Sequence, residues 1–290
     1  MKRFLYIVAT LTIFISCEDV IEVETPSEPP RLIVDAIIKL DTTKQTTIAR
    51  IKLSTSSSFF DETNVVSANL VQIQNVDYKP ANSPLAQNFI RFVEVEPGIY
   101  EASAATQFFT KGRLELYIDY NDERFYSATE FVPSVPIDTL KQGDGTLFSG
   151  DETEVIVSFT DNGETDDFYI LDFDFNEYLV TEDEFYQGQQ FVFSYFYDAE
   201  LKSGTELNIG ILGADEGFYN YMNQILVQSG ANQGPFQTPV ATVRGNVLNV
   251  TGMDNIEALD NVDRSNNFAL GYFAVVQEYK KSIVIYKNEN

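Results

Sequence analysis

The chain has 290 residues, of which 44 are acidic and 19 are basic, and its net charge is -25. This charge argues against a nucleic-acid-binding surface, which needs a basic footprint, and against attraction to anionic lipid. Because the chain has no histidine and one cysteine, it excludes Ser-His-Asp and Cys-His catalysis, His-ligated metal sites and internal disulfides. The chemistry that remains belongs to carboxylates, hydroxyls, Lys, Arg and Tyr.

Residues 1–17 have the pattern of a lipoprotein signal peptide. A basic start precedes an apolar run over residues 4–15, and Ser16 directly precedes Cys17. The run is shorter than the roughly 20 apolar residues that span a bilayer. We therefore expect cleavage before Cys17 and acylation of Cys17, which would anchor the chain to a membrane. An ordinary secretory cleavage site near Cys17 is the alternative.

Residues 18–30 follow as an acidic segment that contains three prolines and has no helical periodicity. This composition is typical of an extended linker. We expect a tether that separates the membrane anchor from the first domain.

Residues 31–134 have the pattern of a run of short β-strands. Their segments are rich in β-branched and aromatic residues, and many alternate apolar and polar positions. In residues 114–118, for example, Glu115 and Tyr117 would lie on the face opposite the apolar residues. Turn signals such as the Asn-Asp pair at 121–122 separate the strands, and no stretch has a convincing helical period. This pattern predicts an immunoglobulin-like or transthyretin-like β-sandwich.

Two prolines in the segment VPSVP, residues 132–136, mark the expected domain boundary, because each removes a backbone donor and stiffens the chain. Residues 135–290 continue with strands, one of them over 167–179. In residues 215–229 the apolar side chains instead fall on one helical face, and Asp215 is suited to cap the start of a helix. We expect a C-terminal β-rich domain with one amphipathic helix.

Seven segments together, in their order and spacing, have the pattern of a known family. These segments are CEDVIEV, PRLIVDAII, PGIYEAS, ERFYSATEFVPSVPIDTL, FYNYMNQIL, GPFQTPVATVRGNV and NFALGYFAVV. The chain resembles an uncharacterised outer-membrane lipoprotein family of Bacteroidota, a domain of unknown function often encoded beside a TonB-dependent transporter. The resemblance spans essentially the whole chain after the signal peptide. It implies a periplasmic or surface lipoprotein that works near a transporter, and it supplies no catalytic residues.

The first residues after Cys17 bear on the side of the membrane that the protein faces. Lipoproteins of this phylum with acidic residues directly after the acylated cysteine are often exported to the cell surface. Glu18 and Asp19 occupy these positions. The resemblance therefore implies an export signal at these two residues, although the chain is acidic throughout.

The densest acidic loop spans residues 161–167. Oxygen atoms for Ca²⁺, which takes about 6–8 oxygen ligands, could come from the following side chains: Asp161, Asn162, Glu164, Asp166 and Asp167. The loop lacks the spacing of an EF-hand. The alternative is an Asx-rich turn between strands.

Two further segments are candidates for chemistry or binding. Paired carboxylates in residues 181–184 could serve glycoside hydrolysis, but we expect them on a solvated hairpin tip. In the strand over residues 191–198, aromatic residues occupy both faces, which indicates a buried central strand or one covered by a partner. Tyr195 and Tyr197 would be the partner-contacting residues in the second case.

Together these patterns favour a non-enzymatic envelope lipoprotein, lipid-anchored in the outer membrane and facing the cell surface. It would bind a nutrient or a TonB-dependent transporter, with no nucleic-acid partner and no cofactor other than the calcium considered above. A surface adhesive or structural β-sandwich protein is the second hypothesis, because fold alone does not determine function. A hydrolase that uses carboxylates alone is the third.

Overall fold

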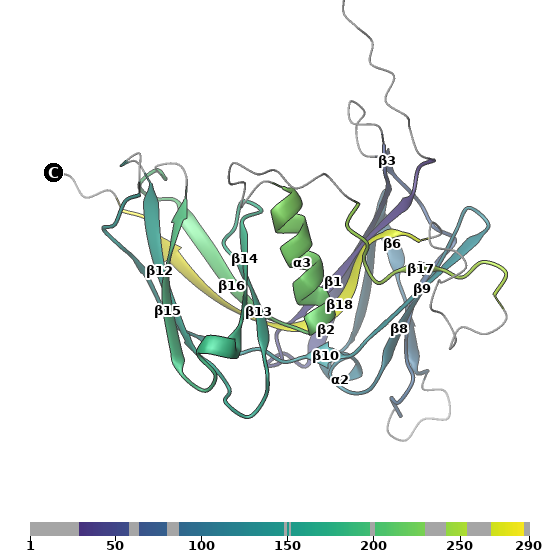
Figure 1. Ribbon diagram of the computed structural model, residues 1–290. Helices are drawn as coiled ribbons and strands as arrows, with labels where there is room; N and C mark the ends of the chain where they lie inside the picture. The colour runs from purple at the N-terminus through teal and green to yellow at the C-terminus, as the bar shows by residue number, and fades with distance from the viewer. Residues whose placement is uncertain are drawn as a thin grey trace, which may run out of the picture.

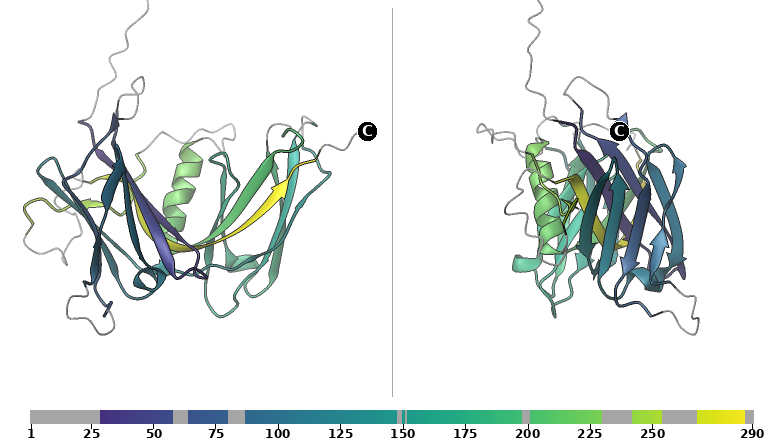
Figure 2. Two further views of the ribbon diagram at one scale, coloured as in Figure 1. Left: turned by 180° about the vertical axis from the view of Figure 1, so that it is seen from behind. Right: turned by 90° about the vertical axis from the view of Figure 1, so that its right-hand side faces the viewer.

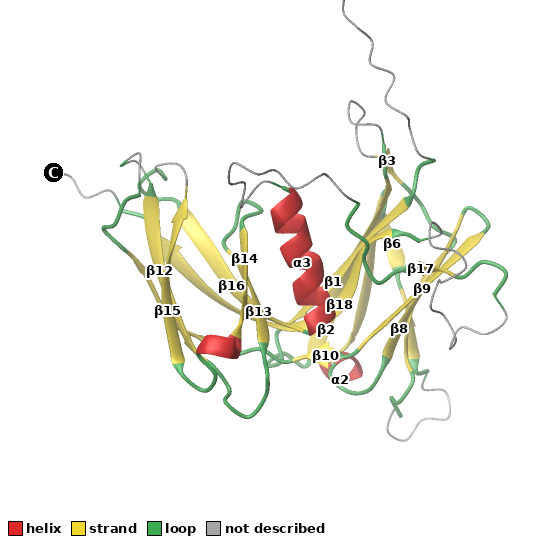
Figure 3. Cartoon of the chain, viewed as in Figure 1, coloured by secondary structure: helices red, strands yellow, loops and turns green. Residues whose placement is uncertain are grey.

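The computed structural model describes residues 29–57, 64–79, 87–147, 150, 152–197, 201–229, 242–253 and 268–286. The protein is mainly β, with several sheets in a sandwich-like arrangement and one sizeable helix, which confirms the fold class predicted from the sequence (Figures 1 and 3). The predicted signal peptide, Cys17, Glu18 and Asp19 lie outside the described residues. Within the described residues, no helix is long and apolar enough to cross a membrane.

In the first part of the chain, the described residues form ten strands and one short helix. They are β1 (Leu32–Leu40), β2 (Thr46–Thr55), β3 (Asn64–Val65), β4 (Leu70–Asn75), β5 (Phe89–Arg91), β6 (Val93–Glu96), β7 (Ile99–Ala105), α2 (Thr106–Phe109), β8 (Leu114–Tyr120), β9 (Glu123–Thr129) and β10 (Phe131–Val132). The longer strands alternate buried and exposed residues, as the sequence pattern predicts for half-buried strands.

In the second part, the residues that the structure describes form eight strands, a short 3-10 helix and the long α-helix. They are β11 (Ile137–Gln142), β12 (Thr153–Thr160), β13 (Phe168–Asp172), β14 (Tyr178–Glu182), η2 (Asp183–Phe185), β15 (Gln190–Tyr197), β16 (Glu206–Ala214), α3 (Glu216–Gln228), β17 (Leu248–Asn249) and β18 (Leu270–Val284). The strand predicted over residues 167–179 is wrong, because it is divided into β13 and β14. Asp174, Phe175 and Asn176 have φ values of 61°, 52° and 62°, and this left-handed turn reverses the chain between them.

The described residues form three sheets. The largest has ten strands, with the main order β14-β13-β16-β18-β1-β2-β7-β6, and β10 and β3 add to it at β18 and β2. A five-stranded sheet of order β17-β9-β8-β4-β5 packs against one part of the large sheet. A three-stranded sheet of order β11-β12-β15 packs against the other part, so that two sandwiches stand side by side (Figures 1 and 2).

Strand β18 belongs to both sandwiches. It pairs in parallel with β1, from Ile33 opposite Leu270 onward, and antiparallel with β16. Phe273 and Val275 enter the core of the first sandwich, whereas Tyr279 packs on the core of the second. The predicted boundary at residues 132–136 lies in the connection between β10 and β11, and the division into two domains stays a prediction.

Helix α3 covers the face of the large sheet opposite to the sandwich cores. The Asp215 side chain accepts a hydrogen bond of 2.7 Å from the backbone N–H of Phe218, so the predicted N-cap is confirmed. Phe218 and Met222 are buried against the alternate residues of β18, including Tyr272, whose ring stacks on Phe218 with centroids 5.1 Å apart. The periodicity of the sequence therefore located both the helix and its buried face.

Candidate functional site

The acidic loop predicted to bind calcium brings together only two of its five candidate residues. Asp161 and Asp167 meet Asp183 of η2, and one carboxylate oxygen from each lies within 4.8 Å of the others. The remaining three candidates are exposed: Asn162, Glu164 and Asp166. The sequence analysis did not assign Asp183 to the calcium candidates. It placed this residue in the acidic segment 181–184, which was expected to be a solvated tip.

Hydrogen bonds already occupy much of this cluster, which we call the aspartate cluster (Asp161, Asp167 and Asp183). Asp161 accepts from the Tyr169 hydroxyl at 2.6 Å and from the Gly188 N–H at 2.7 Å. Asp183 accepts from the Asp167 N–H at 2.9 Å. Burial, with the carboxylates of Asp161 and Asp183, raises the pKa of Asp167. These bonds are those of a structural turn, and calcium binding stays a prediction.

The sequence predicted that segment 181–184 is a solvated hairpin tip, and this prediction is wrong. Asp183 is 6% exposed and its side chain points into the aspartate cluster, while Glu182 and Glu184 are exposed. The chain turns inward here because η2 follows β14 directly. The hydrolase hypothesis for this segment stays a prediction.

The structure contradicts a partner surface at Tyr197, which is buried, whereas Tyr195 is half-buried and a partner contact there stays a prediction. Tyr197 is 2% exposed, and its hydroxyl donates to the Phe173 carbonyl at 2.7 Å. The Tyr195 ring stacks on Phe173 with centroids 3.8 Å apart, and its hydroxyl bonds to Glu177. β15 is also an edge strand of its sheet rather than a central one.

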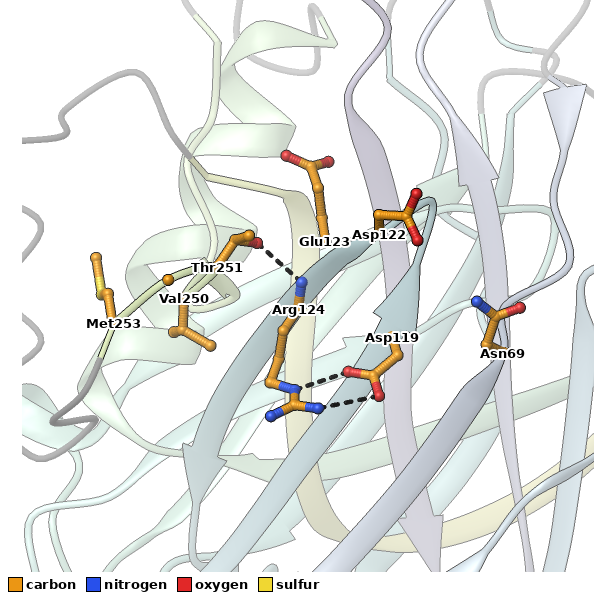
Figure 4. A pocket seen from close by; sticks show the side chains of 9 residues that line it. Asn69, Asp119, Asp122, Glu123, Arg124, Val250, Thr251 and Met253 are labelled. Atoms are coloured by element: carbon orange, nitrogen blue, oxygen red, sulfur yellow. Dashed lines mark hydrogen bonds and ion pairs between the residues drawn. The ribbon is translucent and has the colours of Figure 1, made fainter.

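A pocket of about 390 Å³ lies at the turn between β8 and β9 (Figure 4). It is lined by Asn69, Asp119, Asp122, Glu123, Arg124, Val250, Thr251, Gly252 and Met253. Asn121 and Asp122 form the tight turn, with φ values of 53° and 61°, and the Asn-Asp turn signal of the sequence is confirmed there. Three segments far apart in the chain therefore meet at this pocket.

Arg124 is the central charged group of the pocket. Its Nε and Nη2 atoms donate to the two oxygens of Asp119 at 2.8 Å and 3.3 Å. This carboxylate raises the pKa of Arg124. The pairing is bidentate, so it fixes the plane of the guanidinium as well as its position.

The wall of the pocket formed by residues 250–253 is fastened to β9. The backbone N–H of Arg124 donates to Thr251 Oγ1 at 2.9 Å, and the Val250 N–H donates to the Arg124 carbonyl at 2.8 Å. Asn249, which is buried, donates to Glu123 Oε1 at 2.8 Å. The pocket is thus largely preformed by hydrogen bonds between its own walls.

The pocket continues into the outward face of the five-stranded sheet. Leu116 and Ile118 of β8 point into the core, so Glu115, Tyr117 and Asp119 point outward. Tyr117 lies opposite Tyr126 on β9 and opposite Gln72 on β4. We call the six outward side chains Gln72, Glu115, Tyr117, Asp119, Arg124 and Tyr126 the tyrosine face.

The tyrosine face is held by a network of hydrogen bonds. Both tyrosine hydroxyls donate to Glu115, Tyr117 at 2.8 Å and Tyr126 at 2.9 Å. Arg113 donates to the Tyr126 hydroxyl at 2.8 Å and lies 3.4 Å from Glu115. Burial, followed by the hydrogen bond to Glu115, raises the pKa of Tyr117, so this phenol stays protonated. The arrangement positions polar groups and a ring, and it suits recognition more than proton transfer.

The sequence predicted the strand that carries Tyr117, but it did not predict which residues join Tyr117 in the tyrosine face. The alternation in residues 114–118 already puts Glu115 and Tyr117 on one side. Gln72, Tyr126 and Arg124 join them only through the pairing of β4, β8 and β9, which no local pattern shows.

The chain matches the sequence profile of a family described as a domain of unknown function (DUF4249) over residues 18–282. No curated protein matches the chain.

Proposed function

The chain belongs to the DUF4249 family, and we propose that it is a non-enzymatic lipoprotein of the cell envelope that binds a ligand or a partner. The observation that carries the proposal is the signal-peptide pattern of residues 1–17, which ends at Cys17. Acyl chains on Cys17 would hold the protein on the outer membrane, because each buried methylene contributes about 0.8 kcal/mol. Glu18 and Asp19 would direct it to the cell surface.

The accessory role of the proposal concerns a TonB-dependent transporter. Its support is the resemblance to outer-membrane lipoproteins of Bacteroidota encoded beside such transporters. A shared membrane raises the effective concentration of an anchored protein beside its partner, so even a weak contact would be occupied. Capture of a nutrient and its presentation to the transporter would then need no chemical step.

Binding is favoured over catalysis by the hydrogen bonds of two carboxylates, Asp119 in the pocket and Glu115 on the tyrosine face. The carboxylate of Asp119 is engaged by Arg124, and that of Glu115 by two tyrosine hydroxyls. A general acid or base needs a proton that it exchanges near neutral pH. The chain has no histidine, and these paired groups are placed to orient a ligand instead.

The anchor is tested by metabolic labelling with a fatty acid and by membrane fractionation. We expect the wild-type protein to carry label and to fractionate with the outer membrane, and Cys17→Ser to carry none. A second variant, Ser16→Ala, keeps a small residue before the cysteine and serves as a matched control that retains the label. Unlabelled wild-type protein, or protein found only on the inner membrane, contradicts the proposal.

The partner is tested by mild crosslinking in intact cells, followed by purification of the tagged full-length protein. We expect a transporter barrel in near-stoichiometric yield. Recovery of the protein alone, from cells that express the neighbouring transporter, would contradict the accessory role and favour the adhesive alternative.

A further inference from the structure

We propose that the tyrosine face and the pocket that adjoins it form one binding surface for neutral oligosaccharides. This inference rests on the proposed binding function and names its ligand class. The residues come from three strands that are adjacent in one sheet, and Asp119 and Arg124 belong to both the face and the pocket (Figure 4).

The rows of the sheet place an aromatic ring between polar groups. Gln72, Tyr117 and Tyr126 form one row across β4, β8 and β9, and Asp119 and Arg124 lie in the next row. The two rings are tilted by 59° with centroids 5.4 Å apart. Tyr126 is 6% exposed and supports Tyr117, which keeps part of its surface exposed. A pyranose ring has an apolar C–H face that packs on such a ring.

The polar groups are planar and fixed, which suits the hydroxyl pairs of a sugar. Arg124 uses two of its five N–H donors on Asp119, and within the described residues the other three make no hydrogen bond. The side chain of Arg124 is 59% exposed and that of Asp119 is 29% exposed. Gln72, with an amide that both donates and accepts, is held by Arg91 at 3.4 Å. These groups lose little freedom when a ligand binds.

The charge of the face favours a neutral ligand. On the tyrosine face, Arg124 is paired with Asp119, and Arg113 lies 3.4 Å from Glu115, so each carboxylate of this face is near a guanidinium. The adjoining pocket adds the acidic side chains of Asp122 and Glu123, and Glu123 accepts a hydrogen bond from Asn249. An anionic ligand would have to compete with these carboxylates and approach a chain of net charge -25. On the tyrosine face, a cationic ligand would meet the guanidiniums of Arg113 and Arg124 at the same positions. Hydroxyl groups fit both members of each pair.

The pocket has the volume of a small-ligand site. Its size of about 390 Å³ lies in the range of roughly 300–1,000 Å³ that is common for such sites. The tyrosine face beside it, where Tyr117 is partly exposed, would hold further sugar units along the row of Tyr117. This geometry predicts that an oligosaccharide binds more tightly than its monosaccharide.

The test measures binding of hexasaccharides to the detergent-solubilised full-length protein by isothermal titration calorimetry. The probes are neutral α-1,4-glucan, β-1,4-glucan, β-1,4-xylan and β-1,4-mannan, with oligogalacturonate as the charged comparison. We expect at least one neutral probe to bind, and Tyr117→Ala to weaken it by about tenfold, which is the effect of losing about 1.4 kcal/mol. Tyr117→Phe keeps the ring and should retain most of the affinity.

Phe185→Ala is the matched control, because Phe185 is an exposed ring, 85% accessible, on the other sandwich. It should bind like the wild type. Circular dichroism of each variant shows whether weaker binding comes from the removed side chain or from unfolding of the protein. If Tyr117→Ala does not fold, Arg124→Gln provides the second test, with an expected loss of about fivefold or more.

Three results would overturn the inference: no neutral probe binds, only oligogalacturonate binds, or both Tyr117→Ala and Arg124→Gln bind as tightly as the wild type. The tyrosine face would instead be a protein interface if the wild type binds no sugar and Tyr117→Ala no longer crosslinks to the transporter. If a sugar binds but crosslinking recovers no transporter, the proposed accessory function is contradicted and the sugar-binding inference is not.

Discussion

The carboxylate of Asp167 is held beside two others, and this arrangement has a consequence for stability. Burial and the charges of Asp161 and Asp183 raise its pKa above the ordinary value of 3.8. The folded chain therefore binds this proton more readily than the unfolded chain. Above the folded-state pKa the ionised group lowers the stability of the fold, and this loss disappears as the pH falls through that pKa and below 3.8.

We predict that Asp167→Asn raises the thermal midpoint at pH 7 in the presence of a chelator. The variant removes one of three like charges and keeps an oxygen for the Thr165 hydroxyl, which donates to Asp167 at 2.8 Å. Because Asp167 is only partly buried and solvent screens the repulsion, the gain should be about 0.5 kcal/mol or less. It should vanish at pH values below 3.8. Differential scanning calorimetry across this pH range measures it.

Asp166→Asn is the matched control, because Asp166 is exposed and should give no change. A lower midpoint for Asp167→Asn in chelator would contradict the argument from repulsion. The same experiment tests the calcium prediction: added Ca²⁺ should raise the midpoint of the wild type and leave Asp167→Asn unchanged if the aspartate cluster binds it.

Lys39 on β1 forms ion pairs with residues of two other strands. Its Nζ lies 2.8 Å from Asp172 on β13 and 3.3 Å from Glu278 on β18. Burial lowers the pKa of Lys39, but Glu278 and Asp172 outweigh it and raise the pKa overall. The stabilisation is therefore complete below the ordinary pKa of 10.5 and is lost only as the pH rises through the folded-state value.

We predict that Lys39→Met destabilises the protein by about 2 kcal/mol at pH 7. The variant leaves the partly buried carboxylate of Asp172 without its cation and leaves Glu278 with Lys280, 3.1 Å away. Lys52→Met removes a cation from a more exposed pair, 3.8 Å from Asp35, and should cost less than about 0.5 kcal/mol. Urea unfolding of both variants gives the comparison. Equal losses would mean that the Lys39 pairs are worth no more than a surface contact.

At the scale of elements, the close approach of β18 to β1 depends on Gly271. This residue has a φ of 89°, and a Cβ there would lie 2.0 Å from the carbonyl oxygen of Val34. Gly204 has nearly the same φ, 91°, but a Cβ there would meet nothing within 4 Å. The two glycines therefore separate the effect of backbone strain from the effect of a clash.

We predict that Gly204→Ala costs about 1–2 kcal/mol, the strain of a left-handed alanine, whereas Gly271→Ala costs more than about 3 kcal/mol. The added cost comes from moving β18 away from β1. Equilibrium unfolding in urea measures both values. Similar losses in the two variants would show that β1 and β18 separate without penalty.

The elements that the sequence predicts well are those with a long local pattern. Helix α3 carries its periodicity and its cap at Asp215 within one segment, and the strand alternation in residues 114–118 is equally local. Helix α2 has only four residues, too few for a period, and is held in place by Asn75, which donates to the Phe108 and Lys111 carbonyls at 2.6 Å and 2.7 Å.

The candidate sites depend on contacts between segments far apart in the chain. Asp183 joins Asp161 because η2 turns inward, and Tyr117 meets Gln72 because β8 pairs with β4 in one particular register. A shift of this register by one residue would turn every side chain to the other face. Local sequence does not contain that register, so neither set of neighbours could be predicted.

At the scale of the whole molecule, two cores share one strand. Each sandwich has its own buried cluster, yet β18 lines both, and its alternate residues lie under α3. The first sandwich also takes Val247 and Ala269 from the last part of the chain. The core of the first sandwich is therefore completed by residues of the second predicted domain, 135–290.

We predict that residues 29–134 alone do not fold, and that the full chain unfolds in one transition. The fragment lacks Val247, Ala269, Phe273 and Val275, as well as the parallel partner of β1. Burial of one such apolar side chain as large as valine contributes about 1.5–3 kcal/mol, against a total stability of about 5–15 kcal/mol for a typical domain. Circular dichroism and tyrosine fluorescence during urea unfolding should give coincident curves for the full chain and no cooperative curve for the fragment. Two separate transitions, or a folded fragment, would mean that the first sandwich is an independent domain and that β18 adds to it only after it has formed.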